Sequence, residues 1–261
     1  MPDFDALMTG AEAVARRAAD LLVTMQHTPL GVSRKERHDV VTDADLASER
    51  LVIAGLRALT PEAAILSEEA GLSGPAGPFR WIVDPLDGTV NYACGLPWFS
   101  VTMAYQEHGR TILGITHAPL AGVLARYTRD GLASVNDVPA QVTGTRSLAD
   151  AVVSVVLTSH FSPDEIARTT AVVRRLAEAT RGVRIVVSGG LELSLVAAGR
   201  LDAFVSLKAD VVSHAAAIPL VRAAGGQVTT VAGHDAGDED LEKIASNGLI
   251  HDELLAAIRA A

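Results

Sequence analysis

Short apolar runs alternate with helix-like patterns through the second half of the chain, and this alternation constrains the fold more than any other feature. The apolar runs have the length of strands, and the segments between them have the length of helices. Strands are predicted at 151–157, 183–187 and 203–207, and helices at 163–180, 191–198, 215–224 and from about 252 onward. Strands that alternate with helices favour a mixed, layered α/β fold.

The first half contains the same two kinds of element in a less regular order. Apolar residues at alternating steps of four and three between Leu7 and Met25 predict an amphipathic helix. A second helix is predicted from about Leu46 to Leu59, because Pro61 disfavours a helical conformation in the residue before it. Four short apolar runs bounded by turn residues predict strands, at 63–66, 81–83, 99–105 and 111–116.

The polar, glycine-containing segment 128–145 predicts a hairpin followed by a linker. A chain of 261 residues has enough volume for one large domain or for two closely packed halves. We therefore expect an N-terminal half, 1–145, that carries the acidic motifs described below, and a C-terminal α/β half, 146–261. The two halves are expected to pack as one unit.

Charge and cysteine content exclude several kinds of protein. The formal net charge of −9 argues against binding to a nucleic-acid polymer, because neutralising phosphates needs clustered Lys and Arg. It does not exclude a small anionic ligand, since a bound cation can invert the local field. Cys94 is the only cysteine, which excludes an internal disulfide and a cysteine-based zinc cluster.

No apolar run has the length that a transmembrane helix needs. The longest candidate, 185–205, is interrupted by Glu192, Arg200 and Asp202. The N-terminal stretch "MPDFDALMTG" opens with acids and lacks the basic-then-apolar order of a signal peptide. We therefore expect a cytoplasmic protein that does not bind membranes.

The stretch "RWIVDPLDGTVNY", residues 80–92, places two acids three residues apart at the end of an apolar run. Pro85 lacks an N–H donor and has a fixed φ, so we expect the strand to end there, with Asp84 at its terminus. Strand termini are common positions for ligand-binding groups in α/β proteins. Gly88 can adopt backbone angles closed to other residues, and a helix that begins near Thr89 would offer its free N–H groups as an anion cradle.

Two acids beside an anion site create a conflict, because carboxylates repel an anion such as phosphate. A hard divalent cation between them resolves it, since Mg²⁺ takes oxygen ligands and usually retains water and phosphate oxygens. Asp84, Asp87 and the Leu86 carbonyl between them supply such oxygens. This spacing suits a metal better than acid–base catalysis, in which one carboxyl group must keep its proton.

Two further acidic segments precede this stretch. "DVVTDAD" contains Asp39, Asp43 and Asp45, and "ILSEEAG" places Glu68 and Glu69 after another apolar run. Taken singly, Asp39 or Glu69 is best interpreted as a solvated surface charge. The recurrence of acids in three successive segments, two of them at predicted strand ends, favours a shared site instead.

Together, "DVVTDAD", "ILSEEAG" and "WIVDPLDGTVNY" resemble the motifs of the inositol monophosphatase family of Mg²⁺-dependent, often lithium-sensitive phosphatases. Downstream, "LSLVAAGRLDAFVS", "LVRAAGGQV" and "IASNGLIHDELL" resemble later segments of the family, so the likeness spans nearly the whole chain. It implies a layered α-β-α-β-α sandwich with mixed sheets, a homodimer, and Mg²⁺ as the cofactor with Mn²⁺ as a substitute.

The resemblance also implies roles for single residues. Glu68 would bind the metals, Asp84 and the Leu86 carbonyl would bridge or ligate them, and Asp87 would hold the second metal. Such metals lower the pKa of bound water and stabilise the attacking and leaving oxygens of an in-line displacement.

The same resemblance assigns the remaining parts of the reaction. Thr89 and Asp45 would orient the attacking water, so that Asp45, Glu68 and Thr89 form the catalytic set. Gly88 and Thr89 would offer backbone N–H groups to the phosphate. Phosphoryl transfer depends chiefly on such positioning and charge neutralisation.

The chain departs from the family pattern in one segment. The family has a Trp-Asp pair about a dozen residues before a Glu-Ala-Gly-Gly, and here the pair is Val212 and Ser213, with Ala223 in place of the Glu. An upstream acid that often holds substrate hydroxyls falls on Ser206. Ser213 keeps a helix N-cap but not the negative charge of a metal ligand. Pro219 is expected to kink the following helix.

Three explanations remain open. Asp210 replaces the missing ligand at Ser213, or the enzyme works with fewer protein-held metals on an altered substrate, or the site is degenerate and the protein only binds. His214 is a poor substitute because Mg²⁺ prefers oxygen, and a surface or capping role is expected for it.

The candidate substrate contacts are Gly88, Thr89, Glu192, Ser206 and Ser213. Glu192 lies on the helix predicted after "VSGG", where a solvated position suits it equally well. Arg34 or Lys35 would steer a phosphate or pair with Asp39, or else lie in a plain solvated loop.

We therefore expect a cytoplasmic, Mg²⁺-dependent phosphomonoesterase that hydrolyses a small phosphorylated polyol, sugar or nucleotide. One alternative is a 3′(2′),5′-bisphosphate nucleotidase-like member that acts on a 3′-phosphorylated adenosine compound. The other is a catalytically silent relative that binds a phosphorylated ligand or a protein partner. The expected partner is a small phosphorylated metabolite, with no nucleic-acid polymer and no membrane.

Overall fold

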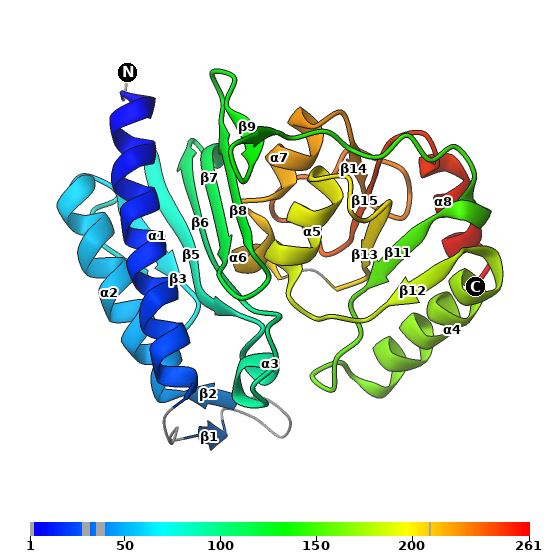
Figure 1. Ribbon diagram of the computed structural model, residues 1–261, viewed down its shortest axis with the longest axis horizontal. Helices are drawn as coiled ribbons and strands as arrows, with labels where there is room; N and C mark the ends of the chain where they lie inside the picture. The colour runs from blue at the N-terminus through cyan, green and yellow to red at the C-terminus, as the bar shows by residue number, and fades with distance from the viewer. Residues whose placement is uncertain (1–2, 28–31, 35–39, 209) are drawn as a thin grey trace.

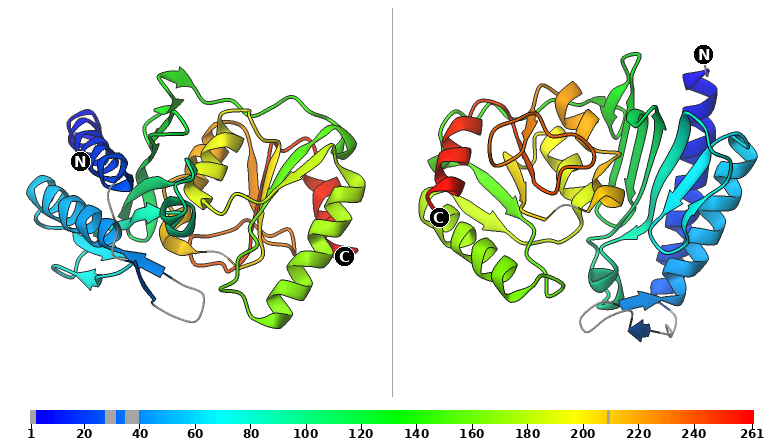
Figure 2. Two further views of the ribbon diagram at one scale, coloured as in Figure 1. Left: turned by 60° about the horizontal axis from the view of Figure 1, so that its bottom comes forward. Right: turned by 180° about the vertical axis from the view of Figure 1, so that it is seen from behind.

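Two large β-sheets and three layers of helices alternate through the computed structural model, which describes residues 3–27, 32–34, 40–208 and 210–261. One helical layer covers the outer face of an eight-stranded sheet, a second lies between this sheet and a five-stranded one, and a third covers the far side of the smaller sheet (Figures 1 and 2). The α-β-α-β-α sandwich with mixed sheets expected from the sequence is confirmed.

The eight-stranded sheet follows the order β10-β9-β8-β7-β6-β5-β3-β4, with β3 and β5 parallel and the other neighbours antiparallel. Its strands are β3 (Ala64–Ser67), β4 (Gly71–Ser73), β5 (Phe79–Asp87), β6 (Ser100–Glu107), β7 (Arg110–Ala118), β8 (Val123–Thr128), β9 (Ala133–Val135) and β10 (Val138–Pro139). Because β3 and β5 run in parallel, the acids that follow the first and end the second meet at one edge.

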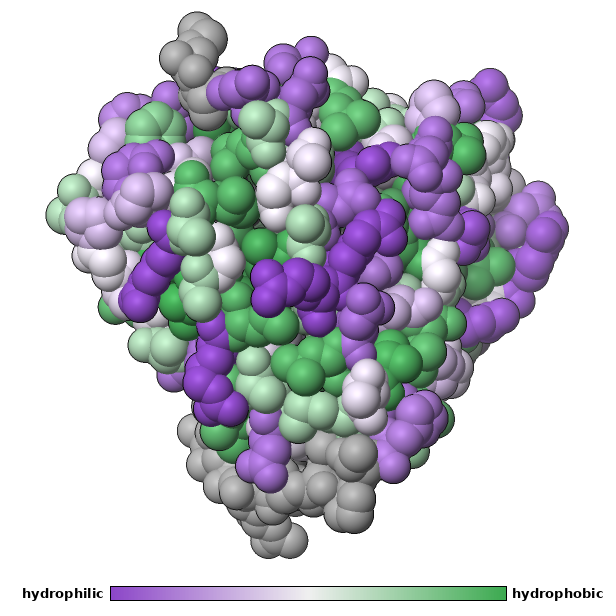
Figure 3. All heavy atoms as spheres, turned by 60° about the vertical axis from the view of Figure 1, so that its left-hand side comes forward, coloured by the Kyte–Doolittle hydropathy of each residue, from purple (hydrophilic) through white to green (hydrophobic). Residues whose placement is uncertain are grey.

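Helices α1 (Phe4–Gln26) and α2 (Asp43–Leu59) cover the outer face of this sheet, across β5, β6 and β7. The apolar stripe of α1 is buried in the resulting core, as its spacing predicted. Hydrophilic and hydrophobic residues are interspersed over the exposed side of this layer (Figure 3). A small antiparallel pair, β1 (Val32–Arg34) and β2 (Val40–Thr42), precedes α2.

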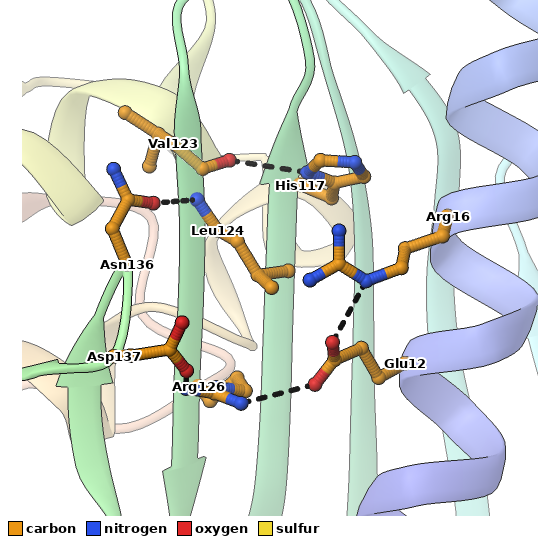
Figure 4. Close-up of polar contacts among 8 residues, drawn as sticks. All are labelled: Glu12, Arg16, His117, Val123, Leu124, Arg126, Asn136 and Asp137. Carbon is orange, nitrogen blue, oxygen red and sulfur yellow. Dashed lines mark hydrogen bonds and ion pairs between the residues drawn. The ribbon is translucent and has the colours of Figure 1, made fainter.

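A group of charged side chains ties α1 to strand β8, and we call it the Arg126 cluster: Glu12, Arg16, Arg126 and Asp137 (Figure 4). Arg126 lies 3.1 Å from Glu12 and also contacts Asp137. Arg16 lies 2.8 Å from Glu12 on the same helix. Each acid of the cluster therefore faces an arginine.

The five-stranded sheet follows the order β12-β11-β13-β15-β14, with β12, β11 and β13 parallel and β15 antiparallel to both neighbours. Its strands are β11 (Val152–Val155), β12 (Gly182–Arg184), β13 (Ala203–Ser206), β14 (Gln227–Thr229) and β15 (Lys243–Ser246). The remaining short elements are α3 (Thr89–Ala93) and the 3₁₀ turn η1 (Leu148–Asp150).

Helices from the second half of the chain fill the space between the sheets. The inner layer consists of α5 (Gly189–Ala197), α6 (Val211–His214) and α7 (Ile218–Ala223), and the outer layer of α4 (Pro163–Ala179) and α8 (His251–Arg259). Helix α5 contacts strands of both sheets, and one buried apolar cluster contains residues from both halves of the chain. Among the described residues, no helix combines the length and apolar composition needed to cross a bilayer.

Most predicted elements are present with shifted ends. The helix predicted from Leu46 begins at Asp43, because Thr42 caps it through a capping box with Asp45. The strand predicted at 183–187 ends at Arg184. Strands β14 and β15 were not predicted, because runs of three and four residues carry too little periodicity.

Strand β5 does not end at Pro85, as expected, but continues to Asp87. Its pairing with β6 shifts register between Asp84, opposite Thr102, and Asp87, opposite Ser100. Pro85, which has no N–H to donate, lies inside this irregularity. The predicted strand end was wrong, but the interruption of the ladder is present.

The helix predicted at 215–224 is present only as α7, which covers Ile218–Ala223, and residues 215–217 form a turn after α6. Helix α6 ends at His214, and α7 has Pro219 in its first turn, where the missing N–H is tolerated. The turn between them lies against β7, and a Cβ on Gly114 would come within 2.3 Å of the Ala216 carbonyl oxygen. The kink expected at Pro219 was wrong, because Pro219 lies in the first turn of α7 and not in the interior of a longer helix.

Candidate active site

A cavity of about 450 Å³ lies between the end of β5, the segment 156–161, the start of α5 and the segment from β13 to α6. The predicted site residues that line it are Glu68, Asp84, Leu86, Asp87, Gly88, Thr89, Ser206, Asp210 and Ser213. The side chain of Arg34 and all of Lys35 and Asp39 lie outside the described residues. The acids of two predicted segments and the divergent segment around Ser213 thus share one cavity.

Asp84 is a buried acid at the register shift of β5. Its Oδ1 accepts a hydrogen bond from the Leu86 N–H at 3.0 Å, and its Oδ2 accepts one from the Ser213 hydroxyl at 2.7 Å. Burial raises the pKa of Asp84 well above its usual range, and the negative charge of Glu68 and of the other cavity acids raises this pKa further. The carboxyl therefore lies where a cation would stabilise its charged form.

Asp87 is held by donors from β6 and from the start of α5. Its Oδ2 accepts hydrogen bonds from the Ser100 and Ser188 hydroxyls at 2.8 and 2.7 Å and from the Gly190 N–H at 3.0 Å. Its Oδ1 accepts one bond, from the Gly189 N–H at 3.1 Å. Oδ2 is saturated, whereas Oδ1 keeps a lone pair for a further partner.

Asp210 lies next to the position at which the family pattern has an acid. It caps α6, with its Oδ1 accepting from the Val212 N–H at 2.9 Å. The Ser213 hydroxyl lies 2.8 Å from the Asp210 Oδ2 and 2.7 Å from the Asp84 Oδ2. The hydroxyl has one hydrogen and can donate to only one of the two carboxylates at a time. Ser213 therefore lies between the two acids, and all three residues line the cavity.

Thr89 and Asp45 form a pair at the edge of the cavity. The Thr89 Oγ1 lies 3.0 Å from the Asp45 Oδ1 and 3.1 Å from the Leu86 carbonyl oxygen. The other oxygen of Asp45 accepts from the N–H and the hydroxyl of Thr42, at 2.7 and 2.6 Å. Asp45 does not line the cavity itself, and burial raises its pKa. Thr89 and Asp45 are thus hydrogen-bonded to each other, and the helix cap at Thr42 that holds Asp45 was not predicted.

Gly88 makes the turn from β5 into α3. Its φ is 92°, in the left-handed region, and a Cβ there would lie 2.8 Å from the Trp98 carbonyl oxygen. Helix α3 begins at Thr89, as predicted, and the first N–H groups of a helix have no partner within it. The turn adjoins the acids, as the anion-cradle interpretation requires.

The fit of a metal can be judged from the donors in the cavity. Among the described residues, no three His, Cys, Asp or Glu side chains converge closely enough to enclose a metal ion by themselves. Mg²⁺ commonly binds through one or two carboxylates and completes its shell with water and phosphate oxygens. The cavity offers carboxylates and a carbonyl oxygen, which are suitable donors for Mg²⁺. Within the described part of the chain, no Lys or Arg forms an ion pair with Asp84, Asp87 or Asp210.

Two residues lie elsewhere than expected. Glu192 is neither a substrate contact nor a solvated residue: it is 0% exposed, does not line the cavity, and accepts hydrogen bonds from Ser154 and Ser188. His214 is not at the surface either. It is buried against the Phe204 ring, and burial lowers its pKa to about 4, so its imidazole is neutral.

A second part of the cavity wall was not predicted. The segment 156–161 between β11 and α4 contributes Thr158, His160 and Phe161, and Lys208 follows β13. The Lys208 Nζ lies 3.1 Å from the Glu165 carboxylate and 5.7 Å from the centre of the Phe161 ring. Residues of these types in a loop have no distinctive spacing, so no signal in the sequence marks them.

Comparison with known proteins agrees with the fold and with the family resemblance. The model of the inositol monophosphatase family matches residues 3–261. A fructose-1,6-bisphosphatase/inositol-1-monophosphatase from Thermotoga maritima is 34% identical over 220 residues, which cover 84% of this chain and 82% of that protein. The Nus factor SuhB of Escherichia coli is 33% identical over 227 residues, which cover 85% of this chain and 84% of that protein.

Solved structures give the same result. The extragenic suppressor protein SuhB from Bartonella henselae superposes with a TM-score of 0.92 at 30% identity, covering 97% of this chain and 98% of that one. An IMPase from Thermotoga maritima superposes with a TM-score of 0.89 at 32% identity, covering 98% of this chain and 97% of that one.

Proposed function

The chain belongs to the inositol monophosphatase family, and we propose that it is a Mg²⁺-dependent phosphomonoesterase that hydrolyses a small phosphorylated polyol, sugar or nucleotide. The position of Asp84 carries the proposal: it is a buried acid, surrounded by other acids, beside the turn formed by Gly88 and Thr89. Such an acid is unfavourable unless a cation offsets its charge, and a cation would also allow phosphate to approach.

The donors fit Mg²⁺, and five of them would hold it in this proposal: Glu68, Asp84, the Leu86 carbonyl, the Oδ1 of Asp87, and Asp210. When bound, Mg²⁺ lowers the pKa of a water molecule and neutralises charge on the phosphate. The inositol monophosphatase family is generally Mg²⁺-dependent, which supports the same assignment.

Thr89 and Asp45 would position the attacking water. A Thr89 hydroxyl that donates to Asp45, 3.0 Å away, keeps its oxygen lone pairs for a hydrogen bond from water. Asp45 is fixed in turn by Thr42, so the pair has a defined direction. The backbone N–H groups at Gly88 and Thr89 would bind phosphate oxygens, which leaves the water and the phosphorus in a fixed arrangement.

We propose further that Asp210 supplies the charge that the family pattern places at Ser213. The two side chains are one hydrogen bond apart, at 2.8 Å, and both line the cavity. The negative charge of Asp210 also raises the pKa of Asp84, so the two carboxylates are close enough to repel each other. In this proposal the charge of the site is kept although the position of the acid has changed.

Phosphate release from a panel of polyol, sugar and nucleotide phosphates in the presence of Mg²⁺ tests the proposed activity. We expect release from at least one compound, and Asp87→Asn should abolish it. The matched control is Asp137→Asn in the Arg126 cluster, which should keep the activity. Competition by an adenosine bisphosphate but not by an inositol phosphate would favour the nucleotidase. No release, together with no Mg²⁺-dependent rise in Tm, would contradict the proposal.

A catalytically silent relative is the second candidate. Relatives at 33% and 34% identity are named Nus factor SuhB, a name that denotes no phosphatase activity, and this chain has Ser213 where the pattern has an acid. A protein of this kind would bind a phosphorylated ligand or a partner without turnover. The expected homodimer, the cytoplasmic location and the absence of a nucleic-acid partner stay predictions, and the first is checked by light scattering of the purified chain.

A further inference from the structure

Glu192 is a buried carboxylate to which the proposed mechanism gives no role. It lies in the first turn of α5 and is 0% exposed. One oxygen accepts from the Ser154 hydroxyl of β11, and the other accepts from the Ser188 N–H at 2.9 Å. Among the described residues, no Lys, Arg or His forms an ion pair with it. Because burying an ionisable group opposes folding, the hydrogen-bond partners of Glu192 indicate what it does.

Ser188 connects Glu192 to the cavity. The Ser188 hydroxyl donates to the Asp87 Oδ2 at 2.7 Å. The N–H groups of the next two residues, Gly189 and Gly190, donate to the same carboxylate at 3.1 and 3.0 Å. Apart from Ser100, the donors around Asp87 therefore all belong to the segment 188–190, whose first residue is hydrogen-bonded to Glu192.

The backbone just before Ser188 is strained and is held from the other side. Val187 has a φ of 61°, in the left-handed region that a β-branched residue rarely adopts. The Asn91 side chain donates to the Val186 carbonyl oxygen at 2.7 Å and to that of Trp98 at 2.9 Å. A Cβ on Gly88 would lie 3.4 Å from the Val187 carbonyl oxygen, so this segment packs directly on the phosphate turn. Such a conformation persists only where surrounding contacts enforce it.

We propose that Glu192 is a positioning residue: by joining Ser154 to the Ser188 backbone, it fixes the segment 186–190 and thereby the direction of Asp87 and the shape of the phosphate turn. This inference rests on the proposed function, in which Asp87 is a metal ligand. Without the contact, the strained backbone at Val187 can relax and carry the donors away from the Asp87 Oδ2. The free oxygen of Asp87 then no longer faces the other donors of the cavity.

Two substitutions at Glu192 test the proposal. Met has a similar length but accepts no hydrogen bond from the Ser188 N–H, whereas Gln keeps an oxygen for it and an amide that donates to Ser154. We expect Glu192→Met to lower kcat and the Mg²⁺ affinity measured by calorimetry about 10–100-fold, with a smaller change in KM. Glu192→Gln should restore most of both.

Asp202 provides a matched control in the same half of the protein. It is 6% exposed, one oxygen accepts from the Thr143 hydroxyl at 2.6 Å, and the other accepts from the Val152 N–H at 2.7 Å. Neither Asp202 nor these partners line the cavity. Asp202→Leu should therefore leave kcat per folded molecule and the Mg²⁺ affinity unchanged, whatever its effect on Tm.

Several results would overturn the inference. One is an unchanged kcat and Mg²⁺ affinity in Glu192→Met. Another is a loss of kcat and Mg²⁺ affinity that is as large in Glu192→Gln as in Glu192→Met. A third is an equal loss of both in Asp202→Leu. If Glu192→Met does not fold, Ser154→Ala takes its place: it keeps Glu192 but removes its anchor on β11, and a loss in the same direction is required. A wild-type protein that neither binds Mg²⁺ nor releases phosphate would instead remove the proposed function, and the inference with it.

Discussion

Two groups of carboxylates in this molecule have opposite surroundings. In the Arg126 cluster, Glu12 and Asp137 both contact Arg126 (Figure 4). In the cavity, Asp84 and Asp87 are buried, and within the described part of the chain neither forms an ion pair with a basic side chain. One group is neutralised by the protein, and the other is held by hydroxyl and N–H groups that leave its charge in place.

The difference separates a structural use of acids from a functional one. Arg126 joins α1 to the sheet, and its contribution is that of a partly exposed ion pair, which is small. The cavity acids raise one another's pKa by burial and repulsion, so the folded chain is less stable for having them. An arrangement that opposes folding and is resolved by an added cation is characteristic of a functional site.

The largest expected effect is at Asp84. Asp84→Asn removes a proposed metal ligand, so we expect the loss of several kcal/mol of transition-state stabilisation, which is a fall in kcat/KM of about 1,000-fold or more. Without Mg²⁺ the same variant should be more stable than the wild type. The pKa of Asp84 is raised in the folded state, so its ionisation lowers the free energy of unfolding as the pH rises above the usual range of a carboxyl group.

Steady-state kinetics and thermal melts in EDTA at pH 8 measure the two effects of Asp84→Asn. Asp137→Asn is the control and should change neither by a comparable amount. A variant that stays active, or that is less stable than the wild type without Mg²⁺, would remove the contrast between the two groups of acids.

The sequence predicted those features of the site that are encoded locally. The acids of β5, the Gly88 turn and the start of α3 follow from one stretch of chain, in which apolar residues, a proline and a glycine have separate physical effects. The layered fold was predictable for a related reason, because strand-length and helix-length patterns alternate along the second half. Its short strands β14 and β15 lack such a pattern.

The support of the site was not predictable in the same way. Ser188 and Gly190 contact Asp87 across 101 and 103 positions of the chain, and small residues carry no signature of a distant partner. Glu192 shows the same difficulty: a charged residue at a helix start is typical of an exposed position, and only the packing of α5 between the sheets buries it. Tertiary contacts decide both cases.

Glu192 gives the next largest expected effect, and it is on stability. Burial raises its pKa from 4.5 to about 7, so the folded state keeps a proton that the unfolded state has lost between these pH values. The free energy of unfolding therefore falls as the pH rises through this window. Glu192→Gln cannot ionise and should gain up to about 3 kcal/mol over the wild type at pH 8 but little at pH 4.5.

Urea titrations of the wild type and of Glu192→Gln at pH 4.5, 6 and 8 measure this gain. A constant difference between the two proteins over the whole range would mean that Glu192 does not titrate with the raised pKa. Asp202→Asn serves as the comparison, because it also replaces a buried carboxyl group with an amide.

Asp210 is expected to have a smaller effect, on the metal alone. Asp210→Asn should weaken Mg²⁺ binding about 10–100-fold, because the charge next to Ser213 is lost. Ser213→Asp in that background returns an acid to the position of the family pattern and should recover the affinity. Calorimetry on both variants decides the matter: an Mg²⁺ affinity that Asp210→Asn leaves unchanged would mean that the cavity works without a replacement acid.

The smallest expected effect lies in the Arg126 cluster, and its size completes the comparison. Glu12→Gln removes the ion pairs of Glu12 with Arg126 and with Arg16, and Arg126 keeps its contact with Asp137. We expect a loss of about 1 kcal/mol or less in the free energy of unfolding, which 1 M salt reduces further because screening weakens exposed pairs. Mg²⁺ affinity and kcat should not change. A loss well above that size, or a change in Mg²⁺ affinity, would mean that the two acidic groups are coupled through α1 and the sheet, and that the protein does not separate paired acids from cation-binding ones.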